Sequence, residues 1–264
     1  MRAALIDRSV VTISGPETHA FLQGLITNDM EKLNSNNPLY AALLTPQGKI
    51  LFDFILADDG AGGVFLDCAA PIRDALMKRL ALYRLRAKVE IKPRDDLAVL
   101  VGWNEPRPET AFDDPRLAAL GWRAVEPRNH AGGDDNYLRH RLELGIPEGG
   151  DFGQDRMFAL DADLEEFHGV SFDKGCYVGQ ELTARMKHRG TARKRLLPIQ
   201  SIDGSDLGPA PVGAGSVNIG DITSIYGACG FALLRLDRLD EAGSIQLTAN
   251  GAIVKVTRPS WLAA

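Results

Sequence analysis

A cysteine stands between two glycines and beside a lysine in residues 174–181, which read KGCYVGQE. The two glycines, Gly175 and Gly179, allow backbone conformations and close approaches that other residues resist. Lys174, with the cations that follow it, supplies a positive field that favours thiolate over thiol. Those cations are Arg185, Lys187, His188 and Arg189. The segment therefore predicts a functional, reactive thiol at Cys176; the alternative is a small buried hydrophobe, the common fate of a free cysteine.

His188 could act as a base for Cys176, which would give a Cys–His pair of the thiol-nucleophile kind. A separation of 12 residues neither supports nor excludes that pair. The local signatures of cysteine proteases are missing, so a hydrolase is not favoured. No HExxH, GxGxxG or GxxxxGK[ST] pattern occurs, which removes the usual support for zinc-protease, dinucleotide and P-loop functions.

The cysteine count limits the metal chemistry. The chain has three cysteines, Cys68, Cys176 and Cys229, which are far apart and form no CxxC pair. This usage is typical of a reducing compartment and not of a disulfide framework. An iron-sulfur cluster normally takes four thiolates, so one chain is not expected to hold a permanent cluster. A bridging cluster at a dimer interface and a transient contact with a client's cluster both remain open.

The composition is that of an ordinary globular protein. The chain has 264 residues, of which 45% are hydrophobic, enough for one large domain or two to three small ones. The net charge of −5 gives no global preference for nucleic acid or an anionic membrane, and we expect neither as a partner. No apolar run approaches the roughly 20 residues that span a bilayer. Residues 1–12 alternate between polar and apolar side chains as a strand does, and they have neither the hydrophobic core of a signal peptide nor the acid-free, Arg-rich composition of a transit peptide.

The first third of the chain is predicted to be a meander of strands with two helices. A capping box at Ser14–Glu17 begins a short helix over residues 19–22, and Pro71 opens an amphipathic helix. The strands are expected over residues 5–13, 39–44, 50–57, 63–68 and 88–92. These elements make up an N-terminal α+β domain, residues 1–94.

The next part, residues 95–192, is predicted to be a second α+β region that carries the KGCYVGQE segment. Its convincing helix covers residues 134–144, with Asp134 as N-cap and Gly145 just past the end. Its other elements are strands over 97–101 and 122–125 and a short helix over 115–120. Residues 193–264 change to short β segments with frequent glycines, which predicts a C-terminal β-barrel or sandwich. Those segments are 196–202, 216–226, 229–236 and 244–258.

Residues 169–195 read GVSFDKGCYVGQELTARMKHRGTARKR, which resembles the signature of the YgfZ family. Shorter matching pieces are FLQG at 21–24, TND at 27–29, LTPQGK at 44–49 and RLELGIP at 141–147. The family includes mitochondrial iron-sulfur assembly factors and is related to the aminomethyltransferase (T-protein) of glycine cleavage. The resemblance covers most of the chain and implies an α+β, T-protein-like multidomain fold with a C-terminal β-barrel around a central folate cavity.

The resemblance implies a tetrahydrofolate-binding protein that supports the assembly or repair of iron-sulfur clusters. Cys176, with Lys174 beside it, would be the functional thiol and a transient cluster ligand. Glu143, with Arg141 and Arg185, would contact tetrahydrofolate or a derivative, because a carboxylate can accept two hydrogen bonds from a pterin. The alternative for Glu143 is an ion pair with Arg139 or Arg141 on the helix surface.

Two basic runs could meet the glutamate tail of a folate or a phosphate-bearing partner. Residues 185–195 hold six Lys or Arg residues and no acid, and residues 84–94 hold five against one glutamate. A solvated basic face is the commoner meaning of such runs. Arg185 follows Glu181 by four residues, so a helical ion pair is their simplest relation.

Two other functions stay open beside the assembly factor. A folate-dependent aminomethyl or methyl transferase is the activity of the parent superfamily, but a thiol, Cys176, replaces the acid usual there. Asp53 is the candidate for the early acid of that chemistry, or else an ordinary surface residue. The other function is a non-catalytic scaffold for assembly factors. Partners would be assembly proteins and client enzymes, in a bacterial cytoplasm or, for a processed eukaryotic chain, the mitochondrial matrix.

Overall fold

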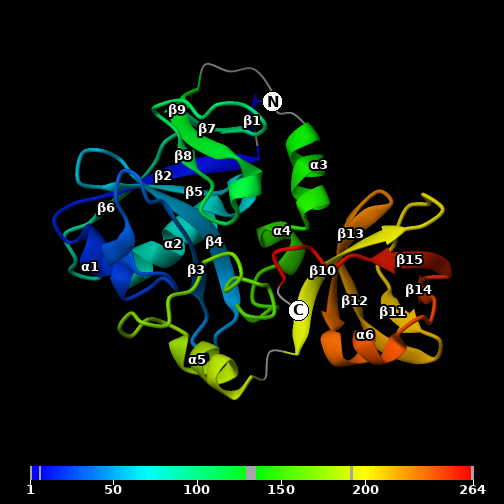
Figure 1. The fold of residues 1–264 in the computed structure, drawn as a ribbon. Coiled ribbons are helices and arrows are strands. Elements are labelled where there is room, and N and C mark those ends of the chain that lie inside the picture. The colour runs from blue at the N-terminus through cyan, green and yellow to red at the C-terminus, as the bar shows by residue number, and fades with distance from the viewer. Residues whose placement is uncertain (1, 6, 129–134, 191–192, 263–264) are drawn as a thin grey trace.

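The computed structural model describes residues 2–5, 7–128, 135–190 and 193–262 (Figure 1). Two antiparallel sheets with their helices form one body, and a closed β-barrel lies beside it. The mixed α+β class with a C-terminal barrel that the sequence predicts is confirmed.

The larger sheet has five strands and follows the predicted meander. In sheet order the strands are β3 (Leu39–Leu44), β4 (Ile50–Asp58), β5 (Val64–Ala69), β2 (Arg8–Ser14) and β6 (Glu90–Pro93). Both faces of this sheet are covered, and β3 shows how: all six of its residues are buried. Ala41 and Leu43 belong to one hydrophobic cluster and Tyr40, Ala42 and Leu44 to another, because successive side chains point to opposite faces.

Helices cover one face of this sheet. They are α1 (Thr18–Gln23), η1 (Met30–Lys32), η2 (Ala70–Ile72) and α2 (Arg73–Arg84). Leu22 of α1 and Leu76 and Leu80 of α2 are fully buried in that cluster. The predicted capping box at the start of α1 does not form: Glu17 is the N-cap residue without a side-chain cap, and its carboxylate accepts a hydrogen bond from the backbone N–H of Lys88 instead.

The second sheet corrects the prediction of one strand over residues 5–13. The chain turns at Asp7, so β1 (Arg2–Leu5) pairs with β7 of the second sheet and β2 pairs within the first. The second sheet has the order β1, β7 (Leu97–Gly102), β9 (Trp122–Pro127) and β8 (Phe112–Asp113), with η3 (Ala118–Leu120) before β9. The segment predicted to be the N-terminal domain therefore contributes a strand to the sheet of the second region.

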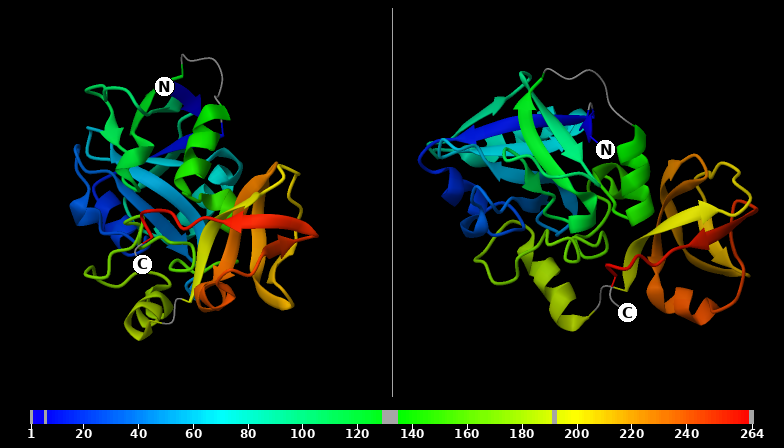
Figure 2. Two further views of the ribbon diagram at one scale, coloured as in Figure 1. Left: turned by 45° about the vertical axis from the view of Figure 1, so that its right-hand side comes forward. Right: turned by 45° about the horizontal axis from the view of Figure 1, so that its top comes forward.

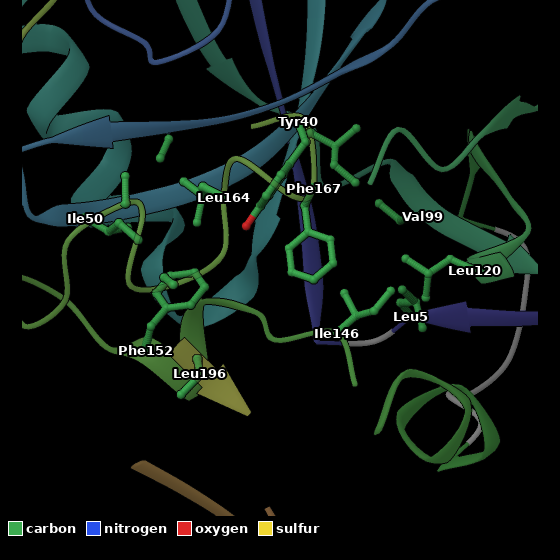
Figure 3. Packing of buried hydrophobic residues seen from close by; sticks show 14 of the residues in the cluster. Leu5, Tyr40, Ile50, Val99, Leu120, Ile146, Phe152, Leu164, Phe167 and Leu196 are labelled. Atoms are coloured by element: carbon green, nitrogen blue, oxygen red, sulfur yellow. The ribbon is translucent and has the colours of Figure 1, made fainter. Parts of the chain in front are cut away.

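The main core lies between the sheets and continues toward the barrel (Figure 3). Tyr40, Val99 and Phe167 come together there from the two sheets and from the irregular chain after α4. The helices of this region are α3 (Asp135–Leu144), α4 (Gly149–Phe152) and α5 (Gln180–Arg189). The predicted N-cap of α3, Asp134, lies outside the described residues.

The barrel closes through antiparallel pairing of β10 with both β13 and β15. Its strands, in order around the barrel, are β10 (Lys194–Ser201), β13 (Cys229–Arg235), β12 (Val217–Tyr226), β11 (Pro211–Ala214), β14 (Leu247–Ala249) and β15 (Ala252–Val256). A short helix, α6 (Leu236–Ala242), follows β13. Two further views show the barrel beside α3 and α4, with α5 at the opposite end of the body from β1 (Figure 2).

Candidate functional site

Cys176 lies in an irregular segment, residues 169–179, that we call the thiol loop. Its side chain is exposed, whereas Cys68 on β5 is fully buried and Cys229 on β13 of the barrel is half-buried. An open groove of about 700 Å³ adjoins the thiol. Its lining consists of Pro46, Tyr83, Cys176, Tyr177, Val178, Gly179, Gln180, Glu181 and Ala184. The structure therefore places this cysteine where a reagent or a partner can reach it.

Lys174 does not point its charge at the thiol. Its ammonium donates to the backbone carbonyls of Gln23, Ile26 and Asn28 at 2.8, 2.8 and 2.6 Å. The residue is 7% exposed, and burial lowers the pKa of its amine to about 8, which leaves it protonated at neutral pH. All three protons are used, so Lys174 fixes the thiol loop to the turn after α1. These contacts favour a positioning role for Lys174, and its role in activating Cys176 stays a prediction.

The first residues of the thiol loop are held by the same turn. The Asn28 side-chain amide donates to the carbonyls of His168 and Tyr40, at 2.7 and 2.8 Å. The Thr27 hydroxyl donates to the carbonyl of Gly169 at 2.6 Å, and the Ser171 N–H donates to the Thr27 carbonyl. The TND piece noted in the sequence is therefore the base on which the thiol loop is built.

The backbone of the thiol loop requires glycine at position 179 but not at position 175. Gly179 has φ +83°, and a Cβ there would lie 2.4 Å from the Thr45 carbonyl oxygen. Gly175 has open space around it and no positive φ. The LTPQGK piece, through Thr45 and Gly48, thus packs against the start of α5. Three pieces that are far apart in sequence meet around Cys176.

The basic stretch after the cysteine forms α5. Arg185, His188 and Arg189 are exposed, and no hydrogen bond or ion pair joins them to the residues described. Lys187 forms an ion pair with Glu165 and lies 5.6 Å from the centroid of the Phe172 ring. The ion pair predicted between Glu181 and Arg185 is not formed; both side chains face solvent. No hydrogen bond joins the described side chains of His188 and Cys176.

The residues predicted to contact folate have separate environments. Arg141 is buried and donates to Asp151 and to the Ile146 carbonyl, both at 2.7 Å. The other Asp151 oxygen accepts from Ser224 and Tyr226 on β12, so Arg141 and Asp151 join α3 and α4 to the barrel. Glu143 is exposed on α3, and among the residues described it has no hydrogen bond or ion pair, including the alternative pairing with Arg139 or Arg141.

A buried network of charges links the two sheets and was not predicted. Arg123 donates to Asp67 and Asp114, both at 2.7 Å. Arg116 donates to Asp114 and, at 2.8 Å, to Glu148. Burial alone would raise the pKa of Asp114, but Arg116 and Arg123 hold it well below its usual range. The signal that could have revealed this network is a single charged residue inside an apolar strand, as in VFLDCA and GWRAV.

Asp53 is not a surface residue. It is 2% exposed on β4, and the Tyr40 hydroxyl donates to it at 3.2 Å. Burial raises the pKa of its carboxyl, against the opposing effect of Arg8. A buried acid is thus present near the position where the transferase hypothesis looked for one.

A second cavity, of about 570 Å³, adjoins the thiol loop and the turn that holds it. Two of its lining residues connect it to the thiol loop: Asn28 donates to the His168 carbonyl just before the loop, and Phe172 belongs to the loop. The cavity is lined by Asn28, Lys32, Asn36, Asn37, Pro38, Leu39, Tyr40, Asp113, Asp114, Pro115, Glu165, His168, Val170 and Phe172. Neither this cavity nor the groove beside Cys176 includes Glu143, Arg141 or Arg185 among its described lining residues.

Within the described residues, no cluster of three or more His, Cys, Asp or Glu side chains is arranged to hold a metal ion. None of the described helices is long and apolar enough to cross a membrane.

Comparison with known proteins places the chain in a family. Residues 193–264 match the family profile of the CAF17 C-terminal beta-barrel domain. The whole chain is similar to the mitochondrial iron-sulfur cluster assembly factor IBA57 of Mus musculus, with 33% identity over 301 residues, 97% of this chain and 84% of that protein. The chain belongs to the YgfZ/CAF17/IBA57 family. The predicted resemblance is confirmed at that level, and the relatives are named IBA57 and not YgfZ.

Further relatives agree with this family. The mitochondrial IBA57 homolog of Neurospora crassa is 33% identical over 228 residues, 74% of this chain and 52% of that protein. The crystal structure of glycine cleavage system aminomethyltransferase T from Bartonella henselae superposes with a TM-score of 0.75 over 98% of this chain and 85% of that chain. At 14% identity this likeness shows the fold alone, and it confirms the T-protein-like architecture.

Proposed function

We propose that this member of the YgfZ/CAF17/IBA57 family is an iron-sulfur cluster assembly factor whose Cys176 thiolate contacts a cluster on its way to client enzymes. The IBA57 relatives are named for cluster assembly. The observation that carries the proposal is an exposed thiol on a loop whose beginning and middle are hydrogen-bonded to the turn after α1 and whose end packs closely against Thr45. Such a thiol is accessible, and its backbone is held in one place.

The cysteine count makes this contact a shared one. A cluster normally takes four thiolates. Cys68 is fully buried and Cys229 belongs to the barrel, so neither lies in the thiol loop. The other ligands would therefore come from a partner or a client, and Cys176 would supply one of them during transfer.

Cys176→Ala tests this proposal in cells that lack the native chain. We expect the activities of iron-sulfur client enzymes to stay low with Cys176→Ala and to be restored by wild type and by Cys229→Ala. Full restoration by Cys176→Ala would overturn the thiol role. In the purified protein we expect Cys176 to be alkylated faster than Cys68, because burial raises the pKa of the Cys68 thiol to about 12.

Tetrahydrofolate is a second ligand that we propose, at a site other than the predicted one. Arg141 is committed to Asp151, and Glu143 and Arg185 line neither of the two cavities described, so we place the proposed ligand in a cavity, while the set on α3 and α5 stays a prediction. The 570 Å³ cavity is within the range of about 300–1,000 Å³ usual for small-molecule sites. There Asp113 and Glu165 could accept pterin N–H groups, His168 and Phe172 offer flat faces, and Lys32 could meet a glutamate tail.

Calorimetric titration with tetrahydrofolate separates the two sites. If the cavity is correct, His168→Ala or Lys32→Ala should weaken binding by about tenfold, corresponding to about 1.4 kcal/mol, and Glu143→Ala should leave it unchanged. The opposite pattern would return the site to α3. No binding by the wild type would remove folate from the function.

The remaining hypotheses make different predictions. The buried acid Asp53 favours a transferase enough to justify one assay. A transferase should carry out folate-dependent one-carbon transfer without iron, and Asp53→Asn should abolish that activity. A scaffold for assembly proteins would be indifferent to Cys176 and to folate. The proposed compartment depends on the organism from which the chain comes. It is the mitochondrial matrix for a eukaryotic chain, as for the relatives that are named mitochondrial, and the cytoplasm for a bacterial chain.

A further inference from the structure

The end of α2 presents apolar side chains to solvent next to the groove beside Cys176. Leu82 is 69% exposed and Leu85 is 88% exposed. Tyr83, between them, lines the groove together with Cys176. Isolated exposed leucines are ordinary, but these two stand three residues apart at the end of the helix that borders the proposed reaction site.

The backbone at Leu85 is unusual. Leu85 is the C-cap of α2 with φ 45° and ψ −106°. Positive φ at a helix end is normally left to glycine, because a side chain there is strained. An exposed leucine in this conformation gains nothing from packing in the isolated chain, and sites of this kind are commonly functional.

Unpaired positive charge surrounds these leucines. Residues 75–89 contain no acid, and neither do residues 182–195 of the neighbouring α5 segment. Within the described part of the chain, no ion pair engages the exposed cations of this face, which are Lys78, Arg79, Arg84, Arg86, Lys88, Arg185 and Arg189. The acids near these cations are Glu181 in the groove, Asp173 in the thiol loop, and Glu17, whose carboxylate accepts a hydrogen bond from the Lys88 backbone N–H. This local charge has the opposite sign to the net charge of −5.

We propose that this face, the end of α2 with the groove and α5, docks an acidic protein that supplies the other cluster ligands to Cys176. The inference rests on the proposed function. A thiolate-ligated cluster carries net negative charge, and an acidic surface around it would complement the cations on this face. Leu82 and Leu85 would enter an apolar depression of the partner, where a few buried side chains carry most of the affinity.

Site-specific photo-cross-linking identifies the occupant. A benzoylphenylalanine replaces Leu85 in cells, and the control carries it at Val217 of the barrel, which is 51% exposed. We expect Leu85 to cross-link to an acidic protein with cluster-ligating cysteines, and Val217 not to. No cross-link from Leu85, or a cross-link to a second copy of this chain, would overturn the proposal.

The captured protein is then purified and its affinity measured with charge-reversal variants. Arg84→Glu combined with Arg86→Glu should weaken binding at least tenfold and reduce its salt dependence, while Lys255→Glu on β15 should change it less than twofold. Equal binding by all variants would overturn the docking face. If Cys176→Ala abolishes client activity while the Arg84/Arg86 variant keeps full activity and affinity, the docking face fails and the thiol role stands.

Discussion

Replacing Lys174 by Met tests whether this lysine holds the thiol loop or activates the thiol. The ammonium donates three hydrogen bonds to the carbonyls of Gln23, Ile26 and Asn28 and is 7% exposed. A hydrogen bond to a charged group contributes about 1.5–3 kcal/mol, but three bonds of one group are not additive, and the cost of burying the charge offsets part of them. We expect a loss of about 3 kcal/mol, the lower end of the 3–5 kcal/mol typical of breaking a buried charged contact.

Thermal unfolding and thiol alkylation measure the two roles in the same samples. A loss of about 3 kcal/mol should lower Tm by about 6–12 °C in a chain of this size. The control is Lys32→Met, which removes an exposed cation after the same turn without removing a side-chain hydrogen bond. With the anchor gone, iodoacetamide should modify Cys176 at an unchanged or higher rate. A Tm equal to that of Lys32→Met together with slower alkylation would refute the positioning role and restore the activating one.

Two further predictions concern the end of the thiol loop and a buried acid. Gly179→Ala should lower the free energy of unfolding by about 2–3 kcal/mol, measured in urea, because the alanine would combine a positive φ with a clash against the Thr45 carbonyl. The control, Gly175→Ala, should be nearly neutral. Equal losses in the two variants would contradict the assigned geometry. Burial raises the pKa of Asp161 to about 6, so the folded state keeps this proton to a higher pH than the unfolded chain and loses stability as pH rises from about 4 to 6. Asp161→Asn should therefore add about 1–3 kcal/mol at pH 7.5 and nothing at pH 4, and a gain of the same size at both pH values would exclude this cause.

Much of the fold follows from local patterns. The mainly apolar runs of β3, β4, β5 and β7 predict those strands within one or two residues of their observed ends. Prediction was less successful where the chain changes direction inside a segment with strand-like alternation, as at Asp7, because two short strands of different sheets then resemble one strand. β11 was missed for the opposite reason: its four residues include Pro211 and Gly213, which normally indicate a turn.

Some structural features of the thiol loop agree with what its sequence indicates, and others could not be read from it. The exposure of Cys176 and the need for glycine at Gly179 agree with the local sequence. The hydrogen-bond partners of Lys174 could not be predicted, because they are backbone carbonyls, which every residue type carries. Arg141 shows the same limit: its sequence context looked like a ligand site, but the contact that occupies it, with Asp151 ten residues away, depends on how α3 and α4 fold back on each other.

The thiol loop meets two requirements of a cluster-transferring thiol, an accessible sulfur and a fixed backbone, through different groups of atoms. The sulfur must be accessible to a partner, and an exposed loop is usually mobile because its backbone groups bond to water. Here contacts with two segments of the body hold the thiol loop: Thr27 binds its first residue, Lys174 ties its middle to the turn after α1, and Gly179 packs closely against Thr45 at its end. Each contact engages backbone atoms and leaves the outer surface free. The side chain of Cys176 can therefore stay exposed while its Cα is fixed, which is the condition for one chain to supply a single cluster ligand in a reproducible position to a partner that supplies the rest.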